Sequence, residues 1–155
     1  MSRFAIAAAF VFLAPNAGAF EIKGISPGMD VSALDLKACQ SVADVDSGMP
    51  GYSCNSTLGG EPSVMRIAVY QSKVVAVLVA VDNGHMSPTK AALAERYGEP
   101  SQPNQFMQKF QWANGNTLFQ IEEKGLGRGY SITLIDFALF KMAQADAKER
   151  VKKDL

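Results

Sequence analysis

The chain has 155 residues and is evenly charged, with 15 Lys and Arg residues against 15 Asp and Glu residues. That balance argues against a protein that binds nucleic acid through a basic surface, and a hydrophobic content of 48% argues against a disordered chain. The length suits one domain.

The first nineteen residues have the three parts of a secretory signal. Arg3 gives a basic start, the residues from Phe4 to Ala14 are apolar, and small residues at 17–19 form a cleavage site. As a helix the apolar run spans about 16 Å, roughly half of a bilayer core, so a membrane anchor is the weaker alternative. We expect cleavage after Ala19, which leaves about 136 residues with a net charge of −1 in the periplasm or outside the cell.

The first half of the remaining chain predicts one helix and a run of strands. Asp30 is placed to cap a helix over about 31–40, and Met29 and Leu34 have the spacing of a hydrophobic staple. Residues 40–51 are rich in turn formers and predict a loop. Strands are expected over 20–24, 52–57, 64–70 and 74–81. The last two form a hairpin, and the second of them is apolar at almost every position, so both of its faces should be covered.

The second half repeats this pattern. Ser87 is expected to cap a helix that has Pro88 at its first position and ends at Gly98. Asn114-Gly115 is the strongest hairpin signal of the chain, and strands are expected over 106–112, 117–123 and 130–136. From Phe137 a helical pattern runs to the end, with one stripe formed by Phe140, Ala143, Ala147 and Val151.

These elements predict an α+β fold, because the strands come in consecutive runs and do not alternate with helices. We expect a single domain over 20–155, built as two tandem units, 20–83 and 84–155. Each unit has a helix and three strands, with the helix packed on one face of an antiparallel sheet, and a C-terminal helix follows.

Cys39 and Cys54 are the only two cysteines. An even count in an exported chain favours a disulfide, and two buried thiols are the alternative. The only histidine is His85, and two cysteines with one distant histidine lack the spacing of a zinc site. We therefore expect neither a metal nor a cofactor.

Two short motifs carry a resemblance to known domains. Residues 24–30 (GISPGMD) precede the first expected helix, and residues 96–100 (RYGEP) close the second. The chain resembles small exported bacterial domains of the beta-lactamase-inhibitor-like and outer-membrane-assembly-lipoprotein-like folds. The resemblance implies helix-plus-sheet units that bind other proteins at a sheet surface and carry no active site. The chain departs from the lipoproteins in having no lipid-attachment cysteine at the cleavage site.

Two serine motifs match catalytic patterns as text only. Ser26 lies in a G-x-S-x-G pattern, but Pro27 follows it and has no N–H to offer an oxyanion. Ser87 and Lys90 match S-x-x-K, yet the partner motifs of the penicillin-recognising enzymes are missing from the chain. Two further pairs are poor candidates. Glu122 and Glu123 are neighbours on an expected strand and would point to opposite faces, so they are not paired carboxylates. Asp82 and His85 are one carboxylate and one histidine, too few for a metal site. We expect no catalytic residue.

Residues 102–120 are rich in amides and aromatics, and Lys109 is their only charge. In the expected strand, one face carries Phe106, Gln108, Phe110 and Trp112, and the other carries Met107, Lys109 and Gln111. The aromatic face is either core or part of a contact surface, since interface centres favour aromatics and few charges. The candidate contact residues are Met107, Lys109, Gln111 and Trp112.

These patterns together predict an exported, soluble, non-enzymatic domain that binds another protein, as an inhibitor or an adaptor does. One alternative is a small accessory protein of the envelope without a tight partner. An unrecognised small enzyme and a small-ligand binder are further alternatives. We expect no nucleic-acid partner and no membrane span, and the sequence does not identify the protein partner.

Overall fold

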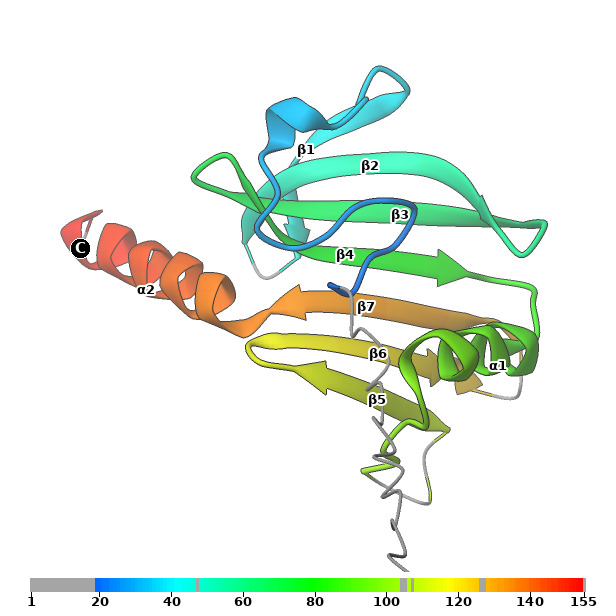
Figure 1. Ribbon diagram of the computed structural model, residues 1–155. Helices are drawn as coiled ribbons and strands as arrows, with labels where there is room; N and C mark the ends of the chain where they lie inside the picture. The colour runs from blue at the N-terminus through cyan, green and yellow to red at the C-terminus, as the bar shows by residue number, and fades with distance from the viewer. Residues whose placement is uncertain (1–18, 47, 104–105, 107, 126–127, 155) are drawn as a thin grey trace, which may run out of the picture.

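A computed structural model describes residues 19–154 except 47, 104–105, 107 and 126–127. Within these residues seven strands form one antiparallel sheet and two α-helices accompany it, so the fold is α+β (Figure 1). The strand order is β1-β2-β3-β4-β7-β6-β5. The strands are β1 (Cys39–Asp46), β2 (Met49–Leu58), β3 (Glu61–Tyr70), β4 (Lys73–Val81), β5 (Lys109–Asn114), β6 (Thr117–Glu123) and β7 (Tyr130–Asp136).

Strand β4 lies at the centre of the sheet, between β3 and β7. The predicted β3–β4 hairpin is confirmed, and its turn residues Gln71 and Ser72 have positive φ angles of 48° and 60°, as a two-residue hairpin turn requires. The expectation that both faces of β4 are covered is confirmed only for its first half, because Leu78 and Ala80 farther along the strand are half-buried. Val77 and Val79 belong to one core cluster, and Val75 belongs to a second cluster.

The second half of the sheet follows the predicted strands closely. β6 and β7 have the predicted bounds, whereas β5 begins at Lys109, three residues later than expected. The β5–β6 hairpin is confirmed, but its loop is Gly115-Asn116, because Asn114 pairs with Thr117. Gly115 has a φ of 58°, which explains the glycine at this position.

One face of the sheet carries the main hydrophobic core. The segment over residues 19–38 and helix α1 (Met86–Tyr97) lie across this face, which we call the covered face (Figure 1). Phe20 is only 6% exposed and meets the ring of Tyr97 edge-on, with 4.9 Å between ring centroids. Phe119 and Trp112 extend this aromatic cluster. Full burial of each large apolar side chain contributes about 1.5–3 kcal/mol.

The helix expected over 31–40 does not form. Only a 3-10 turn, η1 (Val31–Ala33), follows the Asp30 cap, and an extended segment leads on to β1. The physical reason is long-range strand pairing, because Cys39 and Gln40, at the end of the expected helix, pair with Cys54 and Ser53 of β2. The Val31 N–H donates to the Ser72 carbonyl at 2.9 Å, and the Val74 N–H donates to the Met29 carbonyl at 2.9 Å. These bonds fasten the segment to the β3–β4 turn in an extended form.

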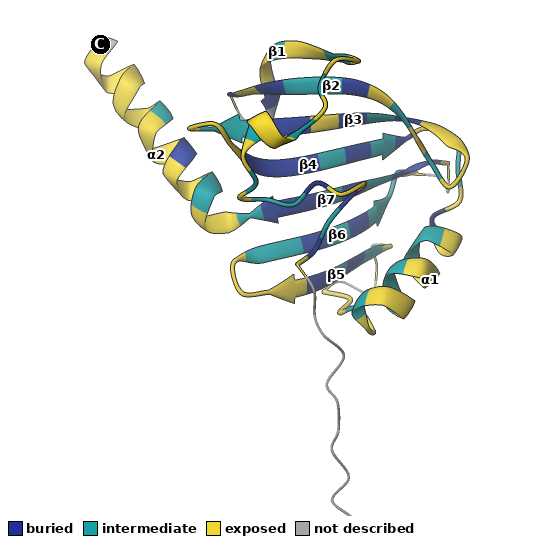
Figure 2. Cartoon of the chain, turned by 45° about the horizontal axis from the view of Figure 1, so that its top comes forward, coloured by how far each residue is buried: buried dark blue, intermediate teal, exposed yellow. Residues whose placement is uncertain are grey.

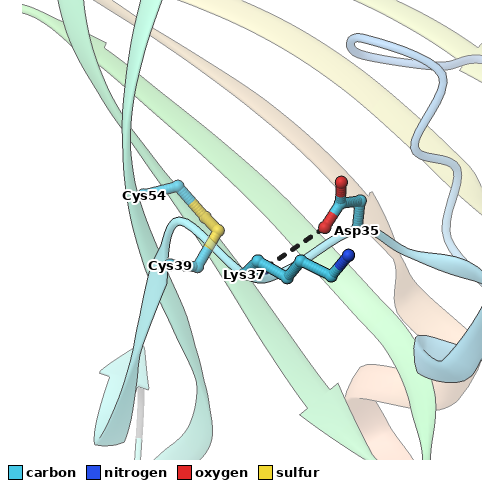
Figure 3. Close-up of a disulfide and its surroundings, with 4 residues drawn as sticks. All are labelled: Asp35, Lys37, Cys39 and Cys54. Carbon is cyan, nitrogen blue, oxygen red and sulfur yellow. Dashed lines mark hydrogen bonds between the residues drawn. A yellow bond between two sulfur atoms is a disulfide. The ribbon is translucent and has the colours of Figure 1, made fainter.

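Residues 40–51, expected to be a loop, instead form most of β1 and the start of β2. The predicted disulfide explains the pairing, because Cys39 and Cys54 are joined and lie directly opposite each other on β1 and β2 (Figure 3). Their Cα atoms are 4.3 Å apart, a separation typical of a non-hydrogen-bonded antiparallel pair. The turn-forming residues of this stretch lie in and after β1, an edge strand whose register with β2 is irregular.

Helix α1 begins two residues earlier than the Ser87 cap predicts. His85 occupies the N-cap position without a side-chain cap bond, and Ser87 lies exposed inside the first turn. Gly98 ends the helix with a φ of 87°, as predicted.

The C-terminal helix, α2 (Phe137–Asp154), begins where β7 ends, as predicted. Asp136 caps it, accepting hydrogen bonds from the N–H groups of Ala138 and Leu139 at 2.8 and 3.0 Å. Phe140 and Ala143 pack on the sheet, but Val151, on the same stripe, is 60% exposed because α2 runs past the edge of the sheet (Figure 2). The expected division into two units is not confirmed, since all seven strands share one sheet.

Candidate functional site

The second face of the sheet is open over most of its width. α2 covers one corner of it, where Ala68, Ala76 and Ile135 are buried against the helix. The strand register places a further set of residues on the same face, beyond the corner that α2 covers. Every residue of this set is half-buried or exposed. We call this set the open face: Ser53, Asn55, Val64, Arg66, Leu78, Ala80, Lys109, Gln111, Gln120, Glu122, Ser131 and Thr133.

The alternate side chains on the same strands are buried, which separates the two faces clearly. Ile67, Val77, Ile132 and Phe119 are at most 2% exposed. Along β3, β7 and β6 the burial colours therefore alternate in Figure 2, whereas the first half of β4 is buried on both faces. The open face thus arises from the same period-two pattern that builds the core.

A hydrogen-bonded row joins four side chains of the open face on β5 and β6. The Gln111 Nε2 donates to the Gln120 Oε1 at 2.8 Å, and the Gln120 Nε2 donates to Glu122 at 3.2 Å. The Lys109 Nζ lies 3.7 Å from the same Glu122 oxygen. The charges of Lys109 and Glu122 therefore offset each other, and the expected contact residues Lys109 and Gln111 do lie at the surface.

Trp112 is not a surface residue. It lies on the covered face, is 4% exposed, and its Nε1 donates to the Gly98 carbonyl at 2.7 Å. Its position therefore does not support the contact role expected for it. Phe106, expected on the same aromatic face, is 89% exposed, because β5 begins after it. Met107, the fourth expected contact residue, lies outside the described residues.

Arg66 occupies the middle of the open face, and it is not among the contact residues expected from the sequence. On β3 it pairs in register with Ser53 on one side and Leu78 on the other. It is exposed and makes no ion pair within the described part of the chain. The alternation of β3, in which Met65 and Ile67 are apolar, is the signal that could have placed Arg66 on the outer face.

The charges of the molecule are divided unevenly between its two sides. The open face and α2 together, which we call the basic side, hold seven basic and four acidic residues, a net charge of +3. The rest of residues 20–155 hold seven basic and eleven acidic residues, a net charge of −4. The net charge of the whole domain is therefore close to zero, although its two sides carry opposite net charges.

Two acidic residues of α2, Asp146 and Glu149, are engaged by neighbours, whereas most of its basic residues are not. The Tyr70 hydroxyl donates to Asp146, which raises the pKa of Tyr70, and Lys152 pairs with Glu149 at 2.7 Å. No ion pair is found among the described residues for four basic side chains of the helix, Lys141, Lys148, Arg150 and Lys153. A groove of about 520 Å³ separates part of α2 from the β3–β4 turn.

Two residues that match catalytic patterns, Lys90 and Asp82, have other side chains as partners. Lys90 stacks over the Phe110 ring at 3.6 Å, and Ser87 is exposed on α1. Asp82 pairs with Lys124 at 2.9 Å. Over the described ranges, no group of three or more His, Cys, Asp or Glu residues is placed to hold a metal ion.

Comparison of the chain with protein-family models, curated proteins and solved structures finds no match. The resemblance to small exported domains therefore stays a prediction from two motifs. No helix in the described part of the chain combines the length and the apolar character needed to cross a membrane.

Proposed function

We infer that this protein is an exported, soluble, non-enzymatic domain of the bacterial periplasm that binds another protein. The open face is the single observation that carries this function. It spans the sheet from β2 at one side to β5 at the other and is formed by amides, hydroxyls and apolar side chains, with the Lys109–Glu122 pair on β5 and β6 and Arg66 near its middle. Protein interfaces have this character at their centres, where charges are few and arginine is enriched.

The shortage of charged residues on the open face supports the proposal that a partner protein covers it. Of its three charged residues, Lys109 and Glu122 offset each other, which leaves Arg66. Val64, Leu78 and Ala80 add half-buried apolar area around it. A partner that covers this area gains from apolar burial and from hydrogen bonds to the neighbouring amides and hydroxyls.

The periplasmic location rests on the secretory signal, and the disulfide fits it. Disulfides persist in oxidising compartments such as the periplasm, and Cys39 and Cys54 are joined. The inhibitor-like or adaptor-like role rests on the resemblance to small exported domains.

Site-specific photo-crosslinking tests the function. A photoreactive amino acid replaces Leu78 on the open face, and a matched variant carries it at Lys37, an exposed position in the segment before β1. We expect the Leu78 variant, exported in its bacterial host, to give a discrete crosslinked product that the Lys37 variant does not give. No product from Leu78, with normal export, would contradict a protein partner and would favour an accessory role without one.

A charge placed on the open face gives a second test. Leu78→Glu together with Gln111→Glu should remove the crosslink formed from a photoreactive residue at Thr133, because buried unpaired carboxylates oppose docking. The melting temperature of the free protein should change little, since both side chains are half-exposed in the monomer.

A further inference from the structure

We propose that the partner of this protein presents an acidic surface, which the basic side binds through Arg66 and the lysines of α2. The proposal rests on the proposed function and adds the chemistry of the partner. Its basis is charge complementarity, because the basic side has a net charge of +3 on a molecule whose remainder has a net charge of −4. An asymmetric field of this kind orients a charged partner as it approaches.

Arg66 and α2 belong to one continuous surface. Ala68, two positions after Arg66 on the same face of β3, is buried in the cluster that Phe140 and Ala143 of α2 join. Arg66 therefore lies next to the place where the helix meets the sheet. A partner over the centre of the open face reaches Arg66 and meets α2 at its margin.

Three of the five basic residues of α2 are gathered on its outer side. At about 100° per residue, Lys141, Lys148 and Lys152 fall within about 40° of one another around the helix axis, opposite the packed residue Ala143. Asp146 lies on a different side and bonds to Tyr70. Lys141 and Lys148 are exposed and free of ion pairs within the described ranges.

A protein surface fits these features better than a lipid surface does. A helix that lies in a membrane interface buries a continuous apolar face. The exposed large apolar side chains of α2 are Phe137, Met142 and Val151. Met142 lies about 140° or more from the other two around the axis, and Phe137 and Val151 are about 21 Å apart along it, so they form no continuous face. The open face adds Gln111, Gln120 and Thr133, whose directional hydrogen bonds a folded partner can match.

Poly-L-glutamate is the probe for acidic polypeptide, and vesicles of phosphatidylglycerol are the probe for an anionic membrane. The full mature protein is titrated with each probe at low salt and at physiological salt. We expect binding to poly-L-glutamate that weakens as salt rises, with backbone amide shifts in NMR spectra confined to the open face and α2.

Two matched triple variants test the surface. Arg66→Glu with Lys141→Glu and Lys148→Glu should weaken poly-L-glutamate binding by about tenfold. The control variant carries Lys23→Glu, Lys37→Glu and Arg128→Glu, which change three exposed basic residues outside the basic side. It alters net charge by the same amount and should bind almost as the wild type does. Circular dichroism confirms that both variants fold.

Three outcomes would overturn the proposal. The first is an equal loss of binding in the two triple variants. The second is tighter binding to the vesicles than to poly-L-glutamate. The third is self-association in sedimentation that joins the basic side of one copy to the acidic remainder of another. A Leu78 crosslink without poly-L-glutamate binding would refute the acidic partner and leave the protein-binding function standing.

Discussion

The indole Nε1 of Trp112 donates a hydrogen bond to the carbonyl of Gly98, the residue that ends helix α1, at 2.7 Å. This bond joins strand β5 to the end of the helix above it. The Trp112 ring also meets Phe119 edge-on, with 6.0 Å between centroids. The only tryptophan of the chain therefore fixes α1 on the sheet.

Replacing Trp112 should destabilise the fold. Trp112→Phe removes the hydrogen bond to Gly98 and part of the packed volume, and we expect a loss of about 1–3 kcal/mol in the free energy of unfolding. Urea unfolding followed by circular dichroism measures it, because the variant has no tryptophan fluorescence. The control Gln111→Ala, on the open face, should cost less than about 1 kcal/mol. Equal losses in the two variants would contradict a core role for Trp112.

The Cys39–Cys54 disulfide should contribute on the order of 3 kcal/mol, because it closes a loop with a sequence separation of 15. Reduction of the wild type should therefore lower the urea midpoint by an amount that corresponds to this energy. The double variant Cys39→Ala with Cys54→Ala should begin at the lower midpoint and should not respond to dithiothreitol. A wild-type midpoint that reduction leaves unchanged would show that the bond does not stabilise the fold.

The exported protein should begin at Phe20. Ala19 is exposed and Phe20 is buried, so the predicted cleavage site coincides with the first residue anchored in the core. Intact-mass spectrometry of protein from a periplasmic extract should give the mass of residues 20–155 with two hydrogens fewer, owing to the disulfide. A product that retains Met1 would contradict both the cleavage and the secretory signal.

Asp30 should stabilise the protein at neutral pH and lose this effect in acid. Its carboxylate accepts hydrogen bonds from the Ser32 hydroxyl at 2.7 Å and the Ser32 N–H at 3.0 Å, and these bonds, with a smaller effect of Lys73, lower the pKa of Asp30. A carboxyl whose pKa is lower in the folded state stabilises above its unfolded value of about 3.9, and the effect fades as pH falls through the folded value.

Asp30→Asn should therefore have a lower melting temperature than the wild type at pH 7, and the difference should shrink below about pH 4. Thermal unfolding at a series of pH values measures this difference. Lys73→Met, which removes only the ion pair at 3.4 Å, should have the smaller effect. A difference that persists unchanged at about pH 2, well below the unfolded value, would mean that the introduced amide disturbs the turn for steric reasons.

Local sequence signals predicted the hairpins well, because strand alternation and turn residues act over a few positions. The bounds of β6 and β7, the β3–β4 hairpin and the start of α2 follow from such signals. The expected helix after Asp30 failed for a non-local reason. Its cap and staple are present in the sequence, but Cys39 and Gln40 pair with the distant strand β2, and only a 3-10 turn forms before them.

The open face was predicted only in part. Lys109 and Gln111 were placed on an outer face correctly, because they alternate with Phe110 and Trp112 along one strand. Arg66 was missed, because its role depends on the order of the strands in the sheet. No local pattern states that β3 lies near the middle and that β7 pairs with β4.

The pairing of β4 with β7 also has a consequence for folding. Every other pairing in the sheet joins strands that are consecutive in the chain, so β1 to β4 and β5 to β7 can each form by local hairpins. Pairing β4 with β7 alone requires the closure of a long loop, which slows folding. The chain is synthesised from its N-terminus, so β4, the most apolar strand, would have one unpaired edge until β7, which begins at Tyr130, has been made. An unpaired apolar edge recruits other chains, so the nascent protein should need protection from aggregation during that interval.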